Sequence, residues 1–147
     1  MLTVDFNVLK LKPGDVVLDA GCGTGRHLRG LAGISGVKYY GIDTKQEDLE
    51  KAAASLGGIP GVTAENCRIQ KADIRRLPFA DAFFDCVICS EVLEHIPEHD
   101  RALEELVRVL KPDGILVISV PRYFPERICW LLSRAYRNEK GGHVRIY

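Results

Sequence analysis

The sequence predicts an α/β protein built on a doubly wound parallel sheet. Runs of apolar residues alternate along the chain with segments of helical period. The runs are apolar throughout, which is typical of strands buried on both faces in a parallel sheet. Because crossovers between parallel strands are right-handed, one sheet with helices on both faces is the simplest arrangement.

Five strands and four helices are predicted. In chain order they are strand 16–20, helix 24–32, strand 37–42, helix 46–56, strand 66–71, strand 85–90, helix 98–110, strand 115–120 and helix 124–137. Turns containing Pro and Gly precede the first and last strands, at residues 12–15 and 111–114. Ligands on such a sheet bind beyond the carboxyl ends of the strands, so polar residues directly after each strand are candidates for a site.

The composition is that of a single globular domain covering residues 1–147. With 20 Lys and Arg against 20 Asp and Glu, the chain lacks the positive surplus of a nucleic-acid-binding protein. Its longest apolar stretch, at residues 115–118, is too short to span a membrane, and no secretory leader is expected. Five cysteines, an odd number, indicate free thiols in a reducing compartment, so a cytoplasmic location is expected.

A glycine-rich loop follows the first predicted strand. The loop reads Gly21-Cys22-Gly23-Thr24-Gly25 and opens a helix, so backbone N–H groups at the helix start are available to a ligand. The second strand ends at Asp43, 18 residues past Gly25, where a carboxylate accepts both hydroxyls of a ribose. Together these features predict a ligand that contains adenosine.

Two details restrict the adenosine ligand further. A dinucleotide fingerprint needs a small residue at the position of Arg26, and no Gly-Lys-Ser/Thr sequence follows to make a P-loop. Asp19, just before the loop, would repel a pyrophosphate but suits a cationic group. The sequence therefore favours a positively charged adenosine ligand without phosphate, and an NAD-dependent oxidoreductase is the less favoured alternative.

Residues 17–25 resemble the first motif of class I S-adenosylmethionine (SAM) methyltransferases. Further motifs of that family follow in order, at residues 41–43, 71–74 with 77–79, 84–96 and 110–116. The similarity covers about residues 8–121 and is greatest to the small-molecule and quinone-biosynthesis type. It implies a SAM-dependent methyltransferase, with SAM as cofactor, S-adenosylhomocysteine (SAH) as its product and a small molecule as methyl acceptor.

The resemblance implies roles for residues of the glycine loop. Gly21 and Gly23 would pass close under the methionine part of SAM, in a loop that also contains Cys22 and Gly25. Asp19 would help to hold the amino end of the methionine. A carboxylate that only braces the loop is an equal alternative for Asp19.

The resemblance also implies roles at the ends of later strands. Asp43 would accept the ribose hydroxyls, and Thr44 would pack beside the adenine. Asp73 would accept a hydrogen bond from the adenine amino group while the Ile74 N–H donates to the ring, and Ser90 would border the methionine end. The alternative for Asp73 is a turn or cap residue, because Asp commonly bonds its own backbone.

Methyl transfer from SAM asks mainly for placement of the acceptor in a water-poor cavity. A general base matters only if the acceptor arrives protonated. Candidates at strand ends are Glu91, His95, Tyr123 and His143, and no catalytic residue is assigned; Glu94 and His95 are expected to brace the loop after strand four. A non-catalytic module that binds SAM or SAH is the alternative function.

Two further motifs are read as structural, and no metal site is predicted. Residues 95–99 spell H-x-x-E-H, but Pro97 cannot lie inside a helix that carries both histidines. It fits instead as a first-turn proline of the following helix. Cys86 and Cys89 spell C-x-x-C, yet on a strand their side chains point to opposite faces.

The predicted helix over residues 124–137 lies in a basic region. From residue 122 onward the sequence contains six basic residues and two acidic ones, Glu126 and Glu139. We expect a helix that covers the sheet with a solvated basic face. The alternative is a lid over the substrate, or a surface that meets anionic lipid or an acidic substrate.

The chain departs from the resembled family at its carboxyl end. Family members usually have seven strands, whereas residues 142–147 fall about where the approach to strand six would begin. We therefore expect five strands in the order 3-2-1-4-5, in a domain that is incomplete at its carboxyl end relative to the family. Strand five would form an apolar edge, through which two copies of the chain could pair.

Overall fold

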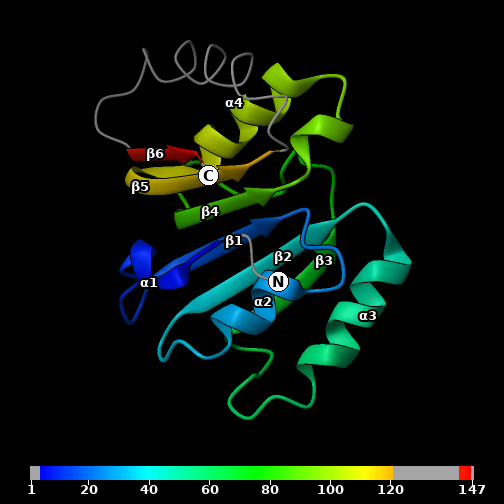
Figure 1. Ribbon diagram of the computed structural model, residues 1–147, viewed down its shortest axis with the longest axis vertical. Helices are drawn as coiled ribbons and strands as arrows, with labels where there is room; N and C mark the ends of the chain where they lie inside the picture. Colours follow the sequence, from blue (N-terminus) through cyan, green and yellow to red (C-terminus); the bar gives the residue numbers. More distant parts are fainter. Residues whose placement is uncertain (1–3, 121–142, 147) are drawn as a thin grey trace.

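A single parallel sheet forms the centre of the molecule in the computed structural model, which describes residues 4–120 and 143–146. Its strand order is β3-β2-β1-β4-β5-β6, as Figure 1 shows. The strands are β1 (Val16–Ala20), β2 (Lys38–Asp43), β3 (Cys67–Lys71), β4 (Phe84–Ser90), β5 (Leu110–Ser119) and β6 (His143–Ile146). Every neighbouring pair is parallel, which confirms the predicted sheet type and the order 3-2-1-4-5 of the five expected strands.

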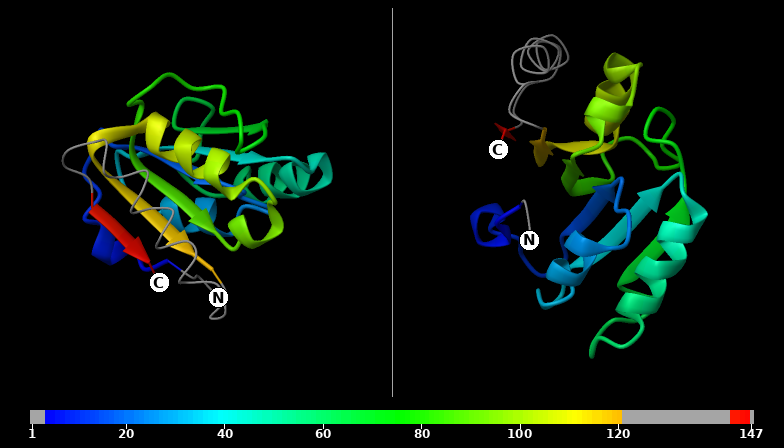
Figure 2. Two further views of the ribbon diagram at one scale, coloured as in Figure 1. Left: turned by 90° about the horizontal axis from the view of Figure 1, so that it is seen from above. Right: turned by 45° about the vertical axis from the view of Figure 1, so that its right-hand side comes forward.

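Helices cover both faces of the sheet, so the doubly wound prediction is also confirmed (Figure 2). They are α1 (Phe6–Leu9), α2 (Arg26–Leu31), α3 (Gln46–Leu56), the short 3₁₀ helix η1 (Leu93–His95) and α4 (His99–Val109). The first three pack their buried leucines against one face, whereas α4 and η1 pack against the other. In α4 the residues on the predicted apolar stripe are buried because they recur at helical spacing: Ala102, Leu103, Leu106 and Val109.

The two faces of β4 have separate cores, and two cysteines mark them. Cys86 lies among the buried residues on the face of α1, α2 and α3, and Cys89 lies among those under α4. Both side chains are fully buried free thiols. The C-x-x-C pair therefore diverges across the sheet, as the alternation along a strand requires.

β6 corrects the expectation that strand five forms an open edge. It pairs with β5 in parallel, from Ile115 opposite His143 to Ile118 opposite Ile146. The edge on which pairing of two copies was expected is thus taken by this chain's own strand. A four-residue strand in polar surroundings carries too little apolar pattern for the sequence to reveal it.

β5 begins earlier than predicted. It starts at Leu110, opposite Phe84, and its register then shifts before Cys86 meets Ile115. The predicted turn at residues 111–114 is the irregularity between these two pairings. The helix predicted over residues 124–137, its basic residues and Tyr123 lie outside the described residues, and within the described part no helix is long and apolar enough to cross a membrane.

Candidate functional site

A cleft of about 490 Å³ opens at the carboxyl ends of the strands. Six residues predicted for the site line it: Gly21, Gly23, Asp43, Thr44, Asp73 and Ile74. The candidate bases Glu91 and His95 line it as well. Four other predicted residues, Asp19, Cys22, Gly25 and Ser90, are not among the described residues that line the cleft. Topology explains the gathering, because parallel strands bring their carboxyl ends to one edge of the sheet.

Asp43 at the end of β2 ties the glycine loop to its neighbouring strand. Its Oδ2 accepts a hydrogen bond from the Gly23 N–H at 2.9 Å, and its Oδ1 accepts one from the Lys45 N–H, also at 2.9 Å. The carbonyl oxygen of Ile42 accepts the N–H groups of Gly21 and Cys22 at 2.8 and 2.9 Å. These bonds fix the loop, and a carboxylate with two such bonds keeps further acceptor positions for a ligand.

Gly21 permits a close approach between the loops after β1 and β4. Its φ is +84°, and a Cβ built there would lie 2.3 Å from a methyl carbon of Val92. Any other residue would be strained and would also push Val92 away. The absence of a side chain at Gly21 therefore sets the position of the Val92 wall of the cleft.

Asp19 is buried beneath the loop, with only 1% of its surface exposed. Neither carboxylate oxygen accepts a hydrogen bond from the described residues. The Nδ1 atom of His27, itself buried, lies 3.6 Å from Asp19 Oδ1. A buried carboxylate without donors is costly, so this side chain is suited to a cationic group brought by a ligand.

Asp73 is held by Arg75, in the manner of a turn residue. Oδ1 accepts the Arg75 N–H at 2.9 Å, and the guanidinium contacts both oxygens, with Nη2 to Oδ2 at 2.7 Å. This guanidinium holds the pKa of Asp73 below its usual range. Arg75 also pairs with Glu98. The alternative interpretation of Asp73 as a turn residue therefore describes its contacts within the chain, and any adenine contact would add to them.

The carboxyl ends of β4 and β5 meet beside the cleft. The hydroxyls of Ser90 and Ser119 lie 2.7 Å apart and are buried. The next residue, Glu91, has a φ of +56°, and its N–H donates to the Ser119 carbonyl at 2.9 Å. A left-handed conformation is unusual for a residue other than glycine, and such strain concentrates at functional sites.

The four cysteines of the described residues are poorly suited to nucleophilic chemistry. Burial raises the pKa of Cys67 to about 11 and that of Cys86 to about 12. The pKa values of Cys22 and Cys89 are raised further by burial, with Asp19 adding to the rise at both. All four therefore stay protonated at neutral pH.

The H-x-x-E-H sequence does not form a helical metal motif. His95 ends η1, whereas His99 begins α4, with Pro97 between the two helices. The two histidines therefore lie on different helices, and no group of possible metal ligands occurs among the described residues.

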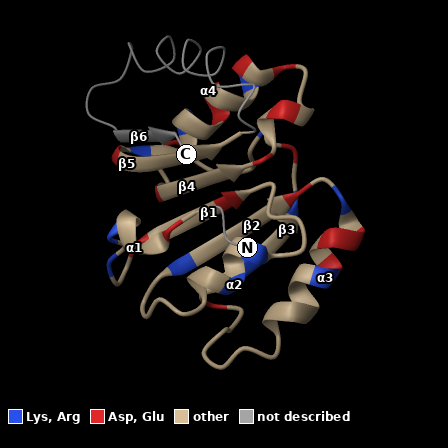
Figure 3. Cartoon of the chain, in the orientation of Figure 1, with Lys and Arg blue, Asp and Glu red and all other residues tan. Residues whose placement is uncertain are grey.

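Eight residues that line the cleft were not predicted for it: Ile42, Lys45, Asp48, Ala72, Arg75, Val92, Ile96 and Pro97. With the predicted residues they give the cleft four carboxylates against two cationic side chains. Figure 3 shows acidic residues, drawn in red, at the ends of β1 and β2 and at the start of α3. The sequence did contain a signal for Lys45 and Asp48, because both closely follow Asp43: Lys45 precedes α3 and Asp48 lies in its first turn.

A match to a known family identifies the kind of protein that contains this cleft. Residues 18–118 match the family described as a methyltransferase domain. The chain belongs to this methyltransferase family. A demethylmenaquinone methyltransferase from Lactobacillus johnsonii is 38% identical to this methyltransferase chain over 122 residues, which cover 79% of the chain and 49% of the relative.

Solved structures agree with the assignment. A SAM-dependent methyltransferase from Aquifex aeolicus is 26% identical, with a TM-score of 0.72, and the match covers 89% of this chain and 76% of that one. The [4+2]-cyclase SpnF is 28% identical, with a TM-score of 0.75, over 85% of this chain and 52% of that one. Family and fold identify SAM as the cofactor. The methyltransferase chain spans 34–49% of the lengths of four curated relatives that it matches.

Proposed function

We propose that this chain binds SAM in the cleft and transfers the methyl group to a small-molecule acceptor. The observation that carries the proposal is the Asp43 carboxylate, held by the Gly23 N–H where the loop after β1 meets the end of β2. A hydroxyl pair of a ribose fits the acceptor positions that remain on such a carboxylate. The surplus of carboxylates in the cleft favours the sulfonium and ammonium groups of SAM over a pyrophosphate.

Each predicted residue then has a place along the ligand. Gly21 and Gly23 would lie under the methionine part, in the loop with Cys22 and Gly25. Asp19, buried and without a hydrogen-bond donor, would face the methionine ammonium group. Asp19 is not among the described residues that line the cleft, so the contact that we propose with the ammonium group runs through a bridging water.

The adenosine end would be held by residues after β2 and β3. Asp43 would accept the ribose hydroxyls, Thr44 would pack beside the adenine, and Asp73 and the Ile74 N–H would bind its edge. Ser90 would border the methionine end through its backbone, since its hydroxyl is turned to Ser119.

When bound, SAM supplies a methyl group that is already activated by the sulfonium charge. The contribution of the chain is to orient the acceptor and exclude water. Glu91 and His95 line the cleft and are the described candidates for a base where the acceptor carries a proton. Tyr123 and His143 remain predictions, and the name of the quinone-modifying relative supports a small, largely apolar acceptor.

A non-catalytic module that binds SAM or SAH is the second candidate function. The solved neighbour named a [4+2]-cyclase has a similar fold but a different named activity, so the fold alone does not require methyl transfer. An NAD-dependent enzyme is less favoured, because Arg26 occupies the position of the small residue in a dinucleotide loop.

Calorimetry with three ligands tests the proposal. We expect SAM and SAH to bind and NADH not to bind, and we expect a [methyl-³H]SAM assay with demethylmenaquinone-type acceptors to show transfer. Binding of NADH in place of SAM would contradict the proposed cofactor site. Binding of SAM without transfer to any small acceptor would favour the non-catalytic module.

Two broader features complete the proposal. Residues 1–147 would act as one SAM-binding domain. The four free thiols of the described residues favour a reducing compartment such as the cytoplasm. Cell fractionation tests the location, and recovery of the protein with membranes after a high-salt wash would contradict it.

A further inference from the structure

The segment between β3 and β4 carries the adenine end of the cleft but belongs to no strand. Asp73 and Ile74 lie at its start, in a turn closed by the Arg76 N–H bonding to the Asp73 carbonyl at 2.9 Å. Beyond this turn, Leu77 and Phe79 have no strand partner among the described residues. Buried or partly buried backbone groups need partners, so other atoms must supply the hydrogen bonds here.

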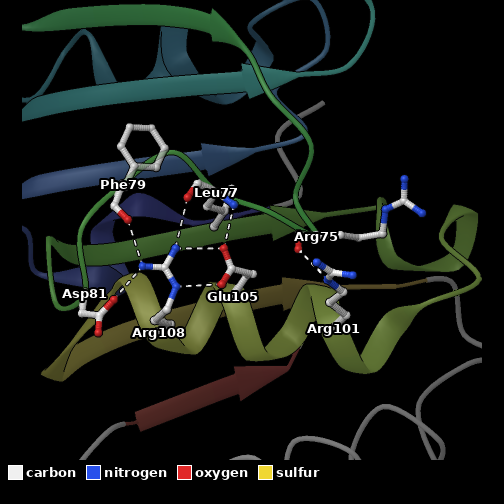
Figure 4. Close-up of polar contacts among 7 residues, drawn as sticks. All are labelled: Arg75, Leu77, Phe79, Asp81, Arg101, Glu105 and Arg108. Carbon is white, nitrogen blue, oxygen red and sulfur yellow. Dashed lines mark hydrogen bonds and ion pairs between the residues drawn. The ribbon is translucent and has the colours of Figure 1, made fainter.

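Side chains of α4 supply those bonds, as Figure 4 shows. The carbonyls of every second residue, 75, 77 and 79, accept from arginines of α4. Arg101 Nε donates to the Arg75 carbonyl at 3.2 Å, and Arg108 Nη1 donates to the Phe79 carbonyl at 2.9 Å. One face of α4 thus takes the place of a neighbouring strand for this segment.

Glu105 and Arg108 form hydrogen bonds with the two backbone groups of Leu77. Glu105 Oε2 accepts the Leu77 N–H at 2.7 Å, while Arg108 Nη2 donates to the Leu77 carbonyl at 3.1 Å. The two side chains also hold each other through two bonds, at 2.7 and 2.8 Å. This geometry needs the planar, forked guanidinium, because an ammonium group cannot reach the carboxylate and two carbonyls in one plane.

The hydrogen bonds that Glu105 and Arg108 make to Leu77 hold the chain next to the turn that lines the cleft. Leu77 directly follows the turn of residues 73–76. Within that turn Arg75 holds the Asp73 carboxylate, and the Arg75 carbonyl itself accepts a hydrogen bond from α4. We infer that Glu105 and Arg108 are positioning residues for adenine recognition, acting through the backbone of Leu77 without touching the ligand. This inference rests on the proposed function.

Ligand discrimination separates positioning from mere stabilisation. S-inosylhomocysteine carries a keto oxygen in place of the adenine amino group and a proton on the adjacent ring nitrogen N1. It therefore presents an acceptor where the amino group would donate to Asp73, and a donor where the ring would accept the Ile74 N–H. We expect the unaltered chain to bind SAH about tenfold or more tightly than this analogue, as sites built to hydrogen-bond a group reject ligands lacking it. A loss of stability alone weakens both ligands equally and leaves their affinity ratio unchanged.

The variants are Arg108→Lys and Glu105→Gln, both mild enough to keep the fold. The matched control is Glu104→Gln, which removes the same charge from an exposed neighbour on α4. Calorimetry should show the ratio of SAH to S-inosylhomocysteine affinity falling several-fold in the two variants and unchanged in the control. Hydrogen exchange without ligand should be faster over residues 73–81 in the two variants and not in the control.

The outcomes distinguish this inference from the proposed function. Failure of the unaltered chain to bind SAH would overturn the proposed function, whatever the exchange rates show. SAH binding with the same affinity ratio in all chains would overturn the positioning role alone, and so would unchanged exchange over residues 73–81.

Discussion

The Asp43 carboxylate accepts the backbone N–H of Gly23 at 2.9 Å, which joins the carboxyl ends of two adjacent strands through one side chain. The same carboxylate caps the turn into α3 through the Lys45 N–H. Asp43 is therefore both a structural support of the glycine loop and the proposed acceptor of the ribose hydroxyls.

Replacing Asp43 with Asn should weaken SAH binding. The amide keeps the shape but loses the charge and one acceptor, and hydrogen bonds to a charged group contribute about 1.5–3 kcal/mol. The upward shift of the melting temperature with SAH should shrink accordingly. Glu47→Gln, at an exposed position in the first turn of α3, is the control and should keep the full shift. An equal shift in the Asp43 variant would remove this residue from the site.

Gly21→Ala should disturb both stability and binding. The new Cβ would be built at a φ of +84° and 2.3 Å from Val92, so we expect a loss of about 2–4 kcal/mol in the free energy of unfolding. Gly61→Ala, at a φ of +86° where a Cβ meets nothing within 4 Å, is the matched control. Denaturant unfolding measures the free energy of unfolding of the two variants. Similar values for the two variants would show that the loops after β1 and β4 do not touch as described.

The Glu105–Arg108 pair should make stability depend on acidity. The hydrogen bond from Arg108, with that from the Leu77 N–H, holds the pKa of Glu105 below its ordinary value of 4.5. The resulting stability is present above that ordinary value and is lost as the pH falls through the lower value in the folded protein. At pH 7 we expect Glu105→Gln to lower the free energy of unfolding by about 1.5–3 kcal/mol.

The difference between Glu105→Gln and the unaltered chain should shrink below about pH 4.5 as Glu105 becomes protonated. Denaturant unfolding between pH 3 and pH 7 measures it, with Glu104→Gln as the control. A difference that stays constant across this range would contradict the ion pair.

Tyr39→Phe should stabilise the protein. Tyr39 is 2% exposed on β2, and its hydroxyl has no hydrogen-bond partner among the described residues. An unsatisfied buried hydroxyl costs about 1–3 kcal/mol, which the substitution should recover in part. Tyr40→Phe, at a half-buried position on the other face, should change little. Thermal unfolding decides between them, and destabilisation by Tyr39→Phe would reveal a partner for the hydroxyl.

The sequence was sufficient for the strand order and for the carboxyl-end location of the cleft. Apolar runs mark the strands, and parallel topology places Gly21, Asp43 and Asp73 at one edge, whereas the strand order is what the resemblance to class I SAM methyltransferases implies. β6 was missed, since four residues after a polar segment show no apolar run. The start of β5 at Leu110 was missed because the pairing with Phe84 depends on tertiary register.

Long-range side-chain geometry could not be predicted from the sequence. Arg108 and Leu77 are 31 residues apart, and only the packing of α4 on the sheet brings the guanidinium to that carbonyl. The fork from Arg75 to Asp73 is local, yet nothing in the spacing predicts that the guanidinium engages both carboxylate oxygens. The burial of Asp19 and the lack of hydrogen-bond donors to its oxygens likewise could not be predicted from the sequence, and its contact with a ligand remains a prediction.

The described residues that line the cleft run from Gly21 to Pro97, in one uninterrupted portion of the polypeptide. On the proposed function, the described residues that hold the methyl donor are in that portion or, like Asp19, directly before it, and all of them precede β5. The part of the chain that binds the methyl donor can therefore be combined with the carboxyl-terminal part of another family member. Chimaeras that exchange everything after residue 120 for the equivalent piece of another family member would acquire that member's acceptor and keep this chain's affinity for SAH.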